Sequence, residues 1–349
     1  MLKNVMILLL VFMLVLTTIV PVPAVVNDRS CSVSTEKSSQ SLIRGQTLYV
    51  GGSGPGNYSK IQDAINDSSD GDTVFVYDDS SPYVENIVVD TSISLLGEEK
   101  NTTVIDAAYK GNGVNITAVD VTIAGFTIQN GNDSGIYLSS NYTRIMDNIV
   151  SDNYYGISNV NHRNLSFPEA SSRGHYTITN NQIIRNGAGI YFANETNSTV
   201  SGNIISQSDF GMTLMGTVND NISFNIISEN NIDVGWGIFI VGSYNTMIYR
   251  NNISHNNLGI WTFITSATKI LQNNFIGNNR TAMSYQWLLS KIRIMKNRLH
   301  LPIHRNVWDE NYWNGPRVLP YIIPGVFLKI SPQVDWHPAQ EPYVISGGV

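Results

Sequence analysis

The chain has 349 residues, only 14% of them charged, and a formal net charge of −6. This acidic balance argues against a nucleic-acid partner, because binding to phosphates needs a basic face. The single cysteine, Cys31, excludes an internal disulfide. A chain of this length can form one elongated domain, since a solenoid grows by adding units and needs no thicker core.

Residues 1–24 have the pattern of a secretory signal peptide. Lys3 precedes an uncharged apolar run from Val5 to Val20, and Val22-Pro23-Ala24 forms a small-residue exit, which predicts cleavage after Ala24. An uncleaved anchor stays open, because the run approaches the length of a membrane span. No later run is long enough to cross a bilayer, so we expect a secreted or cell-surface protein. Residues 25–46 are polar and serine-rich and are predicted to form a flexible leader.

The folded body is predicted to begin with a strand at Thr47–Val50 and a short helix at Tyr58–Ile65. Ser59 is the expected N-cap of this helix, and its apolar residues lie on one face. Those residues are Ile61, Ala64 and Ile65. We expect the helix to cover the open first end of the fold.

A short pattern recurs between residues 148 and 283. Each of its six copies opens with an asparagine, has an aliphatic third residue, and then reaches a small residue followed by an aliphatic one. The opening residues are Asn148, Asn181, Asn203, Asn225, Asn251 and Asn274. The aliphatic residues are Val150, Ile183, Ile205, Ile227, Ile253 and Ile276. The spacing between openings is 22 residues twice, which indicates stacked units.

Each period contains about three short alternating segments, which predicts strands and not helices. We therefore predict an all-β fold, a parallel β-helix over residues 47–300 whose coils stack about 4.8 Å apart. The asparagines are expected in the left-handed conformation at a turn, with amides bonded from coil to coil, and the glycines at a corner that has no room for a Cβ. Residues 301–349 are predicted to be an irregular tail that caps or packs on the solenoid.

Residues 58–107 and the repeats that follow carry a family resemblance. Residues 58–107 resemble the opening of right-handed parallel β-helix proteins of the pectin-lyase-like superfamily, and the Asn and Gly-Ile repeats resemble the NosD-type, carbohydrate-associated subgroup. The resemblance implies right-handed winding. NosD proteins are associated with copper-site assembly, but no Cys/Met/His cluster supports copper here. Pro302 interrupts the metal-like spacing of His300 and His304, so no metal or other cofactor is predicted.

One outward column of the repeats is polar: Asp152, Arg185, Gln207, Glu229, His255 and Asn278. Its two acids are three coil steps apart, about 14 Å, which is too far for a hydrolase pair. A solvated face is the simpler interpretation of this column. Asp152, Arg185, Glu229 and His255, under a loop inserted between Asn159 and His175, remain candidates for a polysaccharide lyase, glycoside hydrolase or uronate epimerase. Calcium is expected only for a lyase.

A second outward column follows the corner glycines and is apolar and aromatic. It contains Tyr137, Ser158, Tyr191, Thr213, Phe239 and Trp261, and two residues further on Val160, Ala193, Met215, Val241 and Phe263. Exposed aromatic rings can stack on sugar rings, so Tyr191, Phe239, Trp261 and Phe263 are the predicted carbohydrate contacts. The alternative is that the C-terminal tail covers this stripe.

These observations predict a secreted or cell-surface β-helix protein that binds a polysaccharide or cell-envelope glycan, or has a structural role in the envelope, without catalysis. Several Asn-x-Ser/Thr sequons make glycosylation plausible for an exported chain. The enzymatic alternative above, a NosD-like accessory factor and a purely structural spacer are the other hypotheses.

Overall fold

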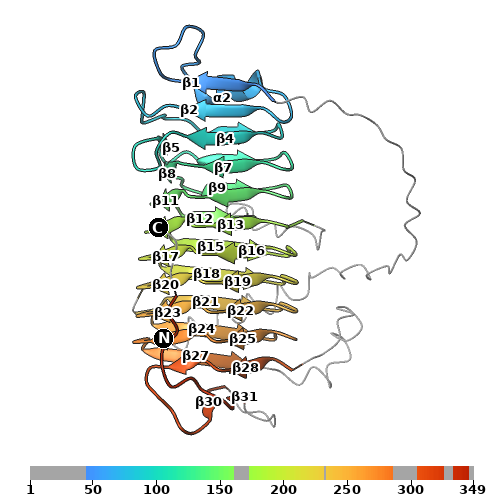
Figure 1. Cartoon of the computed structure of the whole chain (residues 1–349), viewed down its shortest axis with the longest axis vertical. Helices are drawn as coiled ribbons and strands as arrows, with labels where there is room; N and C mark the ends of the chain where they lie inside the picture. Colours follow the sequence, from blue (N-terminus) through green and yellow to red (C-terminus); the bar gives the residue numbers. More distant parts are fainter. Residues whose placement is uncertain (1–44, 161–172, 232, 286–304, 326–332, 346–349) are drawn as a thin grey trace, which may run out of the picture.

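The computed structural model describes residues 45–160, 173–231, 233–285, 305–325 and 333–345. These residues form one elongated stack of coils, with the first strand at one end and the last strands at the other (Figure 1). Three parallel sheets run the length of the stack. The all-β parallel β-helix predicted from the repeats is therefore confirmed.

Most coils contribute one strand to each sheet, and the sheets are called A, B and C here. Sheet A contains β1 (Thr47–Val50), β2 (Thr73–Val76), β4 (Ser94–Gly97), β7 (Thr122–Ala124), β10 (Arg144–Met146), β13 (Thr177–Thr179), β16 (Thr199–Ser201), β19 (Asn221–Ser223), β22 (Met247–Tyr249), β25 (Lys269–Leu271), β28 (Val307–Asp309), β31 (Gln333–Asp335) and β30 (Tyr321–Ile323). Sheet B contains β5 (Val104–Asp106), β8 (Thr127–Gln129), β11 (Ile149–Ser151), β14 (Gln182–Ile184), β17 (Ile204–Ser206), β20 (Ile226–Ser228), β23 (Asn252–Ser254), β26 (Asn274–Ile276) and β29 (Tyr312–Trp313). Sheet C contains β3 (Ile87–Val89), β6 (Val114–Ile116), β9 (Ser134–Leu138), β12 (Tyr155–Ser158), β15 (Ala188–Ala193), β18 (Phe210–Met215), β21 (Trp236–Val241), β24 (Leu258–Phe263) and β27 (Arg280–Tyr285).

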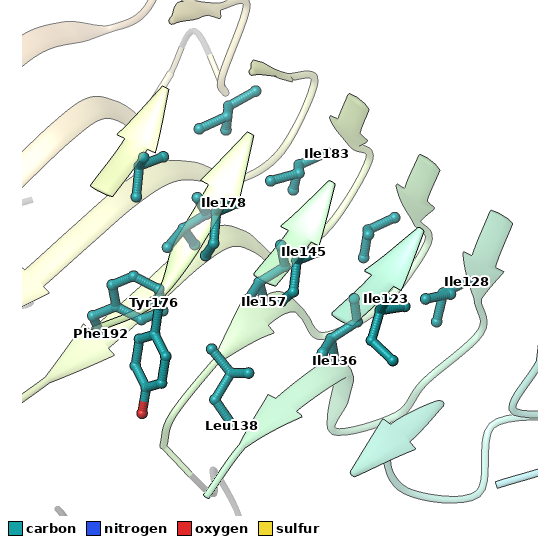
Figure 2. Close-up of a cluster of buried hydrophobic side chains, with 14 of the residues drawn as sticks. Ile123, Ile128, Ile136, Leu138, Ile145, Ile157, Tyr176, Ile178, Ile183 and Phe192 are labelled. Carbon is teal, nitrogen blue, oxygen red and sulfur yellow. The ribbon is translucent and has the colours of Figure 1, made fainter. Parts of the chain in front are cut away.

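The core is made of aliphatic columns, one from each sheet. In sheet B, Ile183, Ile205, Ile227 and Ile253 occupy paired positions on successive strands, and all four are fully buried. Figure 2 shows the same arrangement for Ile123, Ile145 and Ile178 of sheet A. Because a strand alternates its side chains between two faces, one aliphatic residue in each short strand is enough to fill the interior.

A ladder of buried asparagines closes the corner between sheets A and B. The Asn225 Nδ2 donates to the Val200 carbonyl at 2.9 Å and to the Asn251 Oδ1 at 2.9 Å. The Asn225 Oδ1 accepts from the backbone N of Asn203 at 2.9 Å and from its Nδ2 at 3.0 Å. The ladder comprises Asn148, Asn181, Asn203, Asn225, Asn251, Asn273 and Asn311. The predicted bonding of amides from coil to coil is confirmed.

The predicted left-handed conformation of these asparagines is wrong. The residue before the ladder asparagine adopts it instead, as at Asn180 with φ 58°, Phe224 with φ 57° and Arg250 with φ 50°. The physical reason is that two consecutive residues of the corner have different roles. The preceding residue bends the chain, so the asparagine can direct its side chain inward and bond backbone and amide groups of the neighbouring coils.

The register predicted for the sixth copy is wrong by one residue. Asn273 occupies the ladder, while Asn274 pairs with Asn252 and Phe275, not Ile276, pairs with Ile253. Two consecutive asparagines allow either alignment in the sequence. Hydrogen bonding between strands selects the one that places Phe275 in the core, where it is fully buried.

The corner glycines behave as predicted. A Cβ on Gly211 would lie 2.4 Å from the Gly237 carbonyl oxygen, and one on Gly237 would lie 2.6 Å from the Gly259 oxygen. Such distances are well inside van der Waals contact, so these positions need glycine for the close approach of successive coils.

The short helix α2 (Ile61–Asn66) covers the first end of the stack, as expected, with Ile61, Ala64 and Ile65 buried. The prediction of Ser59 as its N-cap is wrong, because the helix begins after Lys60 and no side chain of its own caps it. The Glu85 carboxylate, just before β3, accepts from the backbone N of Ile61 at 3.0 Å and of Gln62 at 3.1 Å. A distant acidic residue therefore satisfies the free N–H groups.

The opposite end is closed by residues from the predicted tail. Strands β28 and β29 continue the parallel stack, and β31 and β30 form an antiparallel pair beyond it. Trp313 stacks between Phe275 at 4.7 Å and Tyr321 at 4.1 Å. The Asp335 Oδ2 accepts from the Asn311 Nδ2 at 3.1 Å, so a carboxylate ends the asparagine ladder.

Within the described ranges, the structure contains no helix with the length and apolar character that a membrane crossing requires. The predicted signal peptide at residues 1–24 and residues 25–44 of the predicted leader lie outside the described residues, as does most of the inserted loop, residues 161–172.

We expect Asn225→Ala to lower the free energy of unfolding by about 3 kcal/mol, because it leaves several buried groups of the ladder without partners. Asn221→Ala is the matched control, since Asn221 lies four residues away on the same coil with an exposed side chain, and its change should stay below about 0.5 kcal/mol. Chemical denaturation of both variants provides the measurement. Equal changes in the two variants would contradict the role of the ladder.

Candidate functional site

The outer face of sheet C carries a group of aromatic side chains, which we call the aromatic strip. It consists of Phe210, Trp236, Phe239, Trp261, Phe263 and Tyr285. They come from β18, β21, β24 and β27, four strands of successive coils that lie side by side in Figure 1. The parallel register places these residues together although they span 76 positions from Phe210 to Tyr285.

The rings of the strip touch one another from coil to coil. Phe210 stacks on Trp236 with a centroid distance of 4.0 Å, and Phe239 lies 4.6 Å from Trp261. Trp261 in turn lies 6.1 Å from Tyr285. These contacts fix the orientation of each ring, so the strip is a preformed surface.

Exposure differs along the strip. Phe239 is only 9% exposed and contacts both tryptophans, whereas Trp236, Trp261, Phe263 and Tyr285 are half-buried. Phe239 therefore supports the tryptophans more than it offers a surface of its own. The row of Ala193, Met215, Val241 and Phe263 is in the predicted register. Ala193 and Val241 in that row are buried, so its accessible part is small.

Of the predicted contacts, Phe239 and Trp261 meet directly, and Phe263 joins them through Tyr285 at 6.1 Å. Tyr191 lies in a separate group, 5.1 Å from Tyr155. Burial, and then the neighbouring Tyr154, raise the pKa of Tyr191 to about 12, so its hydroxyl stays protonated at neutral pH.

Sequence reasoning missed Phe210, Trp236 and Tyr285. Phe210 and Trp236 directly precede the corner glycines Gly211 and Gly237, and that position was available as a signal in the sequence. Tyr285 pairs with Phe263 on the next strand, in a copy where the register had slipped by one residue.

The polar column lies at the corner between sheets B and C. Asp152, Arg185, Gln207, Glu229 and His255 all have positive φ, between 54° and 60°. Gly277, with φ 62°, follows His255, and not the predicted Asn278, because of the shifted register. These residues reverse the chain, and their backbone conformation explains why the column avoids β-branched side chains.

Only two of the catalytic candidates come together. Arg185 donates to Asp152 through Nε at 3.0 Å and Nη2 at 2.8 Å. Burial acts to raise the pKa of Asp152, but hydrogen bonds from Arg185 and Ser151 and the charge of Arg185 outweigh it, so the pKa is lowered. Glu229 and His255 stand on later coils and are exposed. The arrangement is an ion pair on adjacent coils, with no second carboxylate of the column beside it.

The comparisons with known proteins bear on the repeats. The family model described as "Periplasmic copper-binding protein (NosD)" matches residues 161–318, a little less than half of the chain. The repeat region is similar to NosD. This match confirms the resemblance to NosD-type proteins that the Asn and Gly-Ile repeats predicted. No curated protein matches this sequence.

Several solved structures are also similar. The alginate lyase from Paenibacillus sp. str. FPU-7 has a TM-score of 0.47 and 13% identity, covering 76% of this chain and 99% of that chain. XylC in complex with xylose has a TM-score of 0.42 and 12% identity, covering 70% of this chain, which spans 50% of that chain. The A-module of mannuronan C-5 epimerase AlgE6 from Azotobacter vinelandii has a TM-score of 0.39 and 12% identity, covering 73% of this chain and 83% of that chain. Similarity at this level assigns no activity.

The description of the matched NosD family names copper. Copper prefers thiolate, thioether or imidazole donors. Within the described ranges no three His, Cys, Asp or Glu side chains gather as a metal site requires. Cys31, His300 and His304 lie outside those ranges.

Sequence reasoning also missed a buried pair of acids, Glu195 and Asp220, at the corner between sheets C and A. Glu195 is fully buried and Asp220 is 2% exposed. The Ser198 hydroxyl donates to Glu195, and the Ser198 backbone N donates to the Asp220 Oδ1 at 3.0 Å. The neighbouring coils have serine or threonine at the positions equivalent to these two acids. An acidic residue in a column that otherwise carries hydroxyl side chains was therefore the available signal in the sequence.

The two acids strongly perturb each other. Burial, followed by repulsion from Asp220 and the hydrogen bond to it, raises the pKa of Glu195 well above its usual value. Burial raises the pKa of Asp220 to about 6, although hydrogen bonds from Glu195, Thr217 and Ser198 oppose the shift. The pair therefore retains a proton far above the pH at which an exposed carboxyl releases it.

This pair makes stability depend on pH. Both carboxyl pKa values are higher in the folded than in the unfolded chain, so the folded state binds more protons above about pH 4, and stability falls as pH rises through Asp220's pKa of about 6. Glu195→Gln keeps the hydrogen bonds and removes one ionisable group.

We expect Glu195→Gln to be more stable than the wild type at pH 7.5, on the order of 2 kcal/mol, and equally stable near pH 4. Thermal unfolding across this pH range is the measurement, with Glu229→Gln as an exposed control that follows the wild type. If Glu195→Gln is more stable than the wild type by the same amount at both pH values, the ionisation of Glu195 is not the cause of the difference.

Proposed function

We propose that this chain is an exported β-helix protein that binds a polysaccharide or another cell-envelope glycan on the aromatic strip and does not cleave it. The observation that carries the proposal is the strip itself, a contiguous set of partly exposed aromatic rings held in fixed contact. An exposed apolar surface of this kind on a soluble protein usually marks a contact.

The chemistry of the strip suits a sugar. Pyranose rings present apolar C–H faces that stack on aromatic rings, while their hydroxyls remain in water. Half-buried Trp261 and Trp236 offer large indole faces, and Phe263 and Tyr285 extend the surface to the next coil. Because the rings are already ordered by one another, little side-chain entropy is lost when a ligand binds.

The absence of catalysis is proposed from the placement of the acids. Hydrolysis of a glycosidic bond requires two carboxylates on either side of it. In the polar column the carboxylate of Asp152 is engaged by Arg185. The close pair Glu195 and Asp220 is buried, so a substrate has no access to it.

Export is proposed from two observations. The predicted signal peptide at residues 1–24 directs the chain out of the cytoplasm. The matched NosD family is described as periplasmic, which supports a periplasmic or extracellular location. The acidic net charge of −6 favours a glycan over a nucleic acid as the partner.

We expect Trp261→Ala and Phe263→Ala in the mature chain to weaken glycan binding by at least about tenfold, or about 1.4 kcal/mol, because each removes a stacking face. Tyr49→Ala is the matched control, since Tyr49 is an exposed aromatic residue on the outer face of sheet A. A glycan array followed by titration calorimetry measures the effect.

Unchanged affinity in both strip variants would contradict the assigned contacts. The same protein incubated with uronic-acid polymers and calcium should release neither unsaturated products nor new reducing ends. Release of either would favour the lyase, hydrolase or epimerase alternative over the proposed binding role.

A further inference from the structure

We infer that the glycan bound by the aromatic strip is an uncharged polysaccharide, and that its chain lies parallel to the axis of the β-helix. This inference rests on the proposed function and names the ligand class for the same surface. It is carried by the charge content of sheet C and of its surroundings and by the direction of the ring contacts.

Sheet C is almost free of charge. Across its nine strands the only charged residue is Arg280, at the start of β27, although charged residues make up 14% of the whole chain. Sheet B is similar, with Asp106 on β5 as the one charged residue of its nine strands. Sheet A differs, because it presents Arg144 on β10 and Lys269 on β25, both exposed. The face that carries the strip is therefore almost uncharged, a property that it shares with sheet B.

In the part of the chain that the structure describes, most charged residues beside the strip are acidic, the wrong sign for binding a polyanion. Asp209 immediately precedes Phe210, and Asp233 lies three residues before Trp236; both are exposed. Glu229 is exposed at the adjacent corner. A uronate polymer carries one carboxylate on each ring, and these acids would repel it.

A comparison of magnitudes decides the ligand class. The strip spans four strands, or three coil steps of about 4.8 Å, which accommodates about three sugar rings. A uronate chain would bring about three carboxylates to this surface, where Arg280 is the single cation on the strands. Burying a carboxylate that has no cationic partner costs more free energy than the stacking of one ring recovers. A neutral chain avoids this cost.

The contacts between rings follow the long axis of the molecule. Phe210, Trp236, Trp261 and Tyr285 belong to β18, β21, β24 and β27, and each ring touches the ring of the next coil. A linear polymer laid along this direction can place successive sugars on successive coils. A polymer lying across the strands would meet only the few rings of a single strand.

The test compares hexasaccharides of equal length by titration calorimetry with the mature chain. The neutral probes are cellohexaose and xylohexaose, and the charged probes are hexagalacturonate and hexamannuronate, each with and without calcium. We expect a neutral probe to bind at least tenfold more tightly than either uronate. Its affinity should change less than twofold between 50 and 500 mM salt, as estimated from the near absence of charge on the strip.

Two variants assign the binding to the strip. Trp261→Ala should reduce binding of the neutral probe at least tenfold, while Trp261→Phe, which keeps a stacking ring, should retain most of it. Arg280→Gln should leave that affinity unchanged. Melting curves of all variants show whether each is folded, and the phenylalanine variant keeps the test decisive if the alanine variant is not.

The possible failures are distinguishable. A uronate hexamer that binds more tightly than the neutral probes, weakens with salt and is lost in Arg280→Gln would overturn this inference and leave the proposed function standing. Binding of none of the four probes, nor of any polysaccharide on the array, would overturn the proposed function itself.

Discussion

The structure depends on one constraint, the in-register stacking of successive coils. Parallel strand pairing aligns each coil on the one before it, and the asparagine ladder repeats that alignment at the corner between sheets A and B. Each ladder amide bonds a backbone carbonyl of the preceding coil and the amide of the next. A coil that slipped by one residue would turn its aliphatic side chain outward and leave these buried groups unpaired. The ends are closed by α2 and by Trp313 with Asp335, so neither end exposes the apolar columns.

The same stacking creates the surface features. Residues separated by one period become neighbours about 4.8 Å apart, so any side chain repeated at an outward position forms a continuous row. On sheet C this produces the aromatic strip, in which Phe239 and Trp261 touch because β21 and β24 are paired. At the opposite edge of that sheet it brings Glu195 and Asp220 together in a buried place. The in-register stacking of coils thus produces both the proposed binding surface and the pH-sensitive acid pair.

The faces and corners of the three sheets have different roles. The inner faces of all three sheets supply the core, the corners carry the left-handed residues and the asparagine ladder, and the outer face of sheet C carries the aromatic strip proposed to bind a glycan. The polar column that first suggested catalysis belongs to the corner group, where backbone reversal fixes the residue type. Its charged members are an ion pair, Asp152 with Arg185, and isolated side chains. A corner column of this kind is weak evidence for chemistry.

The sequence by itself determined the parallel β-helix, the aliphatic columns, the amide ladder, the glycine corner and the capping helix, because each is a local pattern repeated with a fixed period. It also located Phe239, Trp261 and Phe263 on one outward face. Only the tertiary structure decided the register of the sixth copy, since Asn273 and Asn274 are equivalent in sequence and differ only in which one lets Phe275 reach the core. The tertiary structure also decided that Phe210, Trp236 and Tyr285 belong to the strip. It likewise brought Glu195 beside Asp220, and placed Glu85 at the start of α2. These are contacts between coils, and their existence depends on which residues the stacking places side by side.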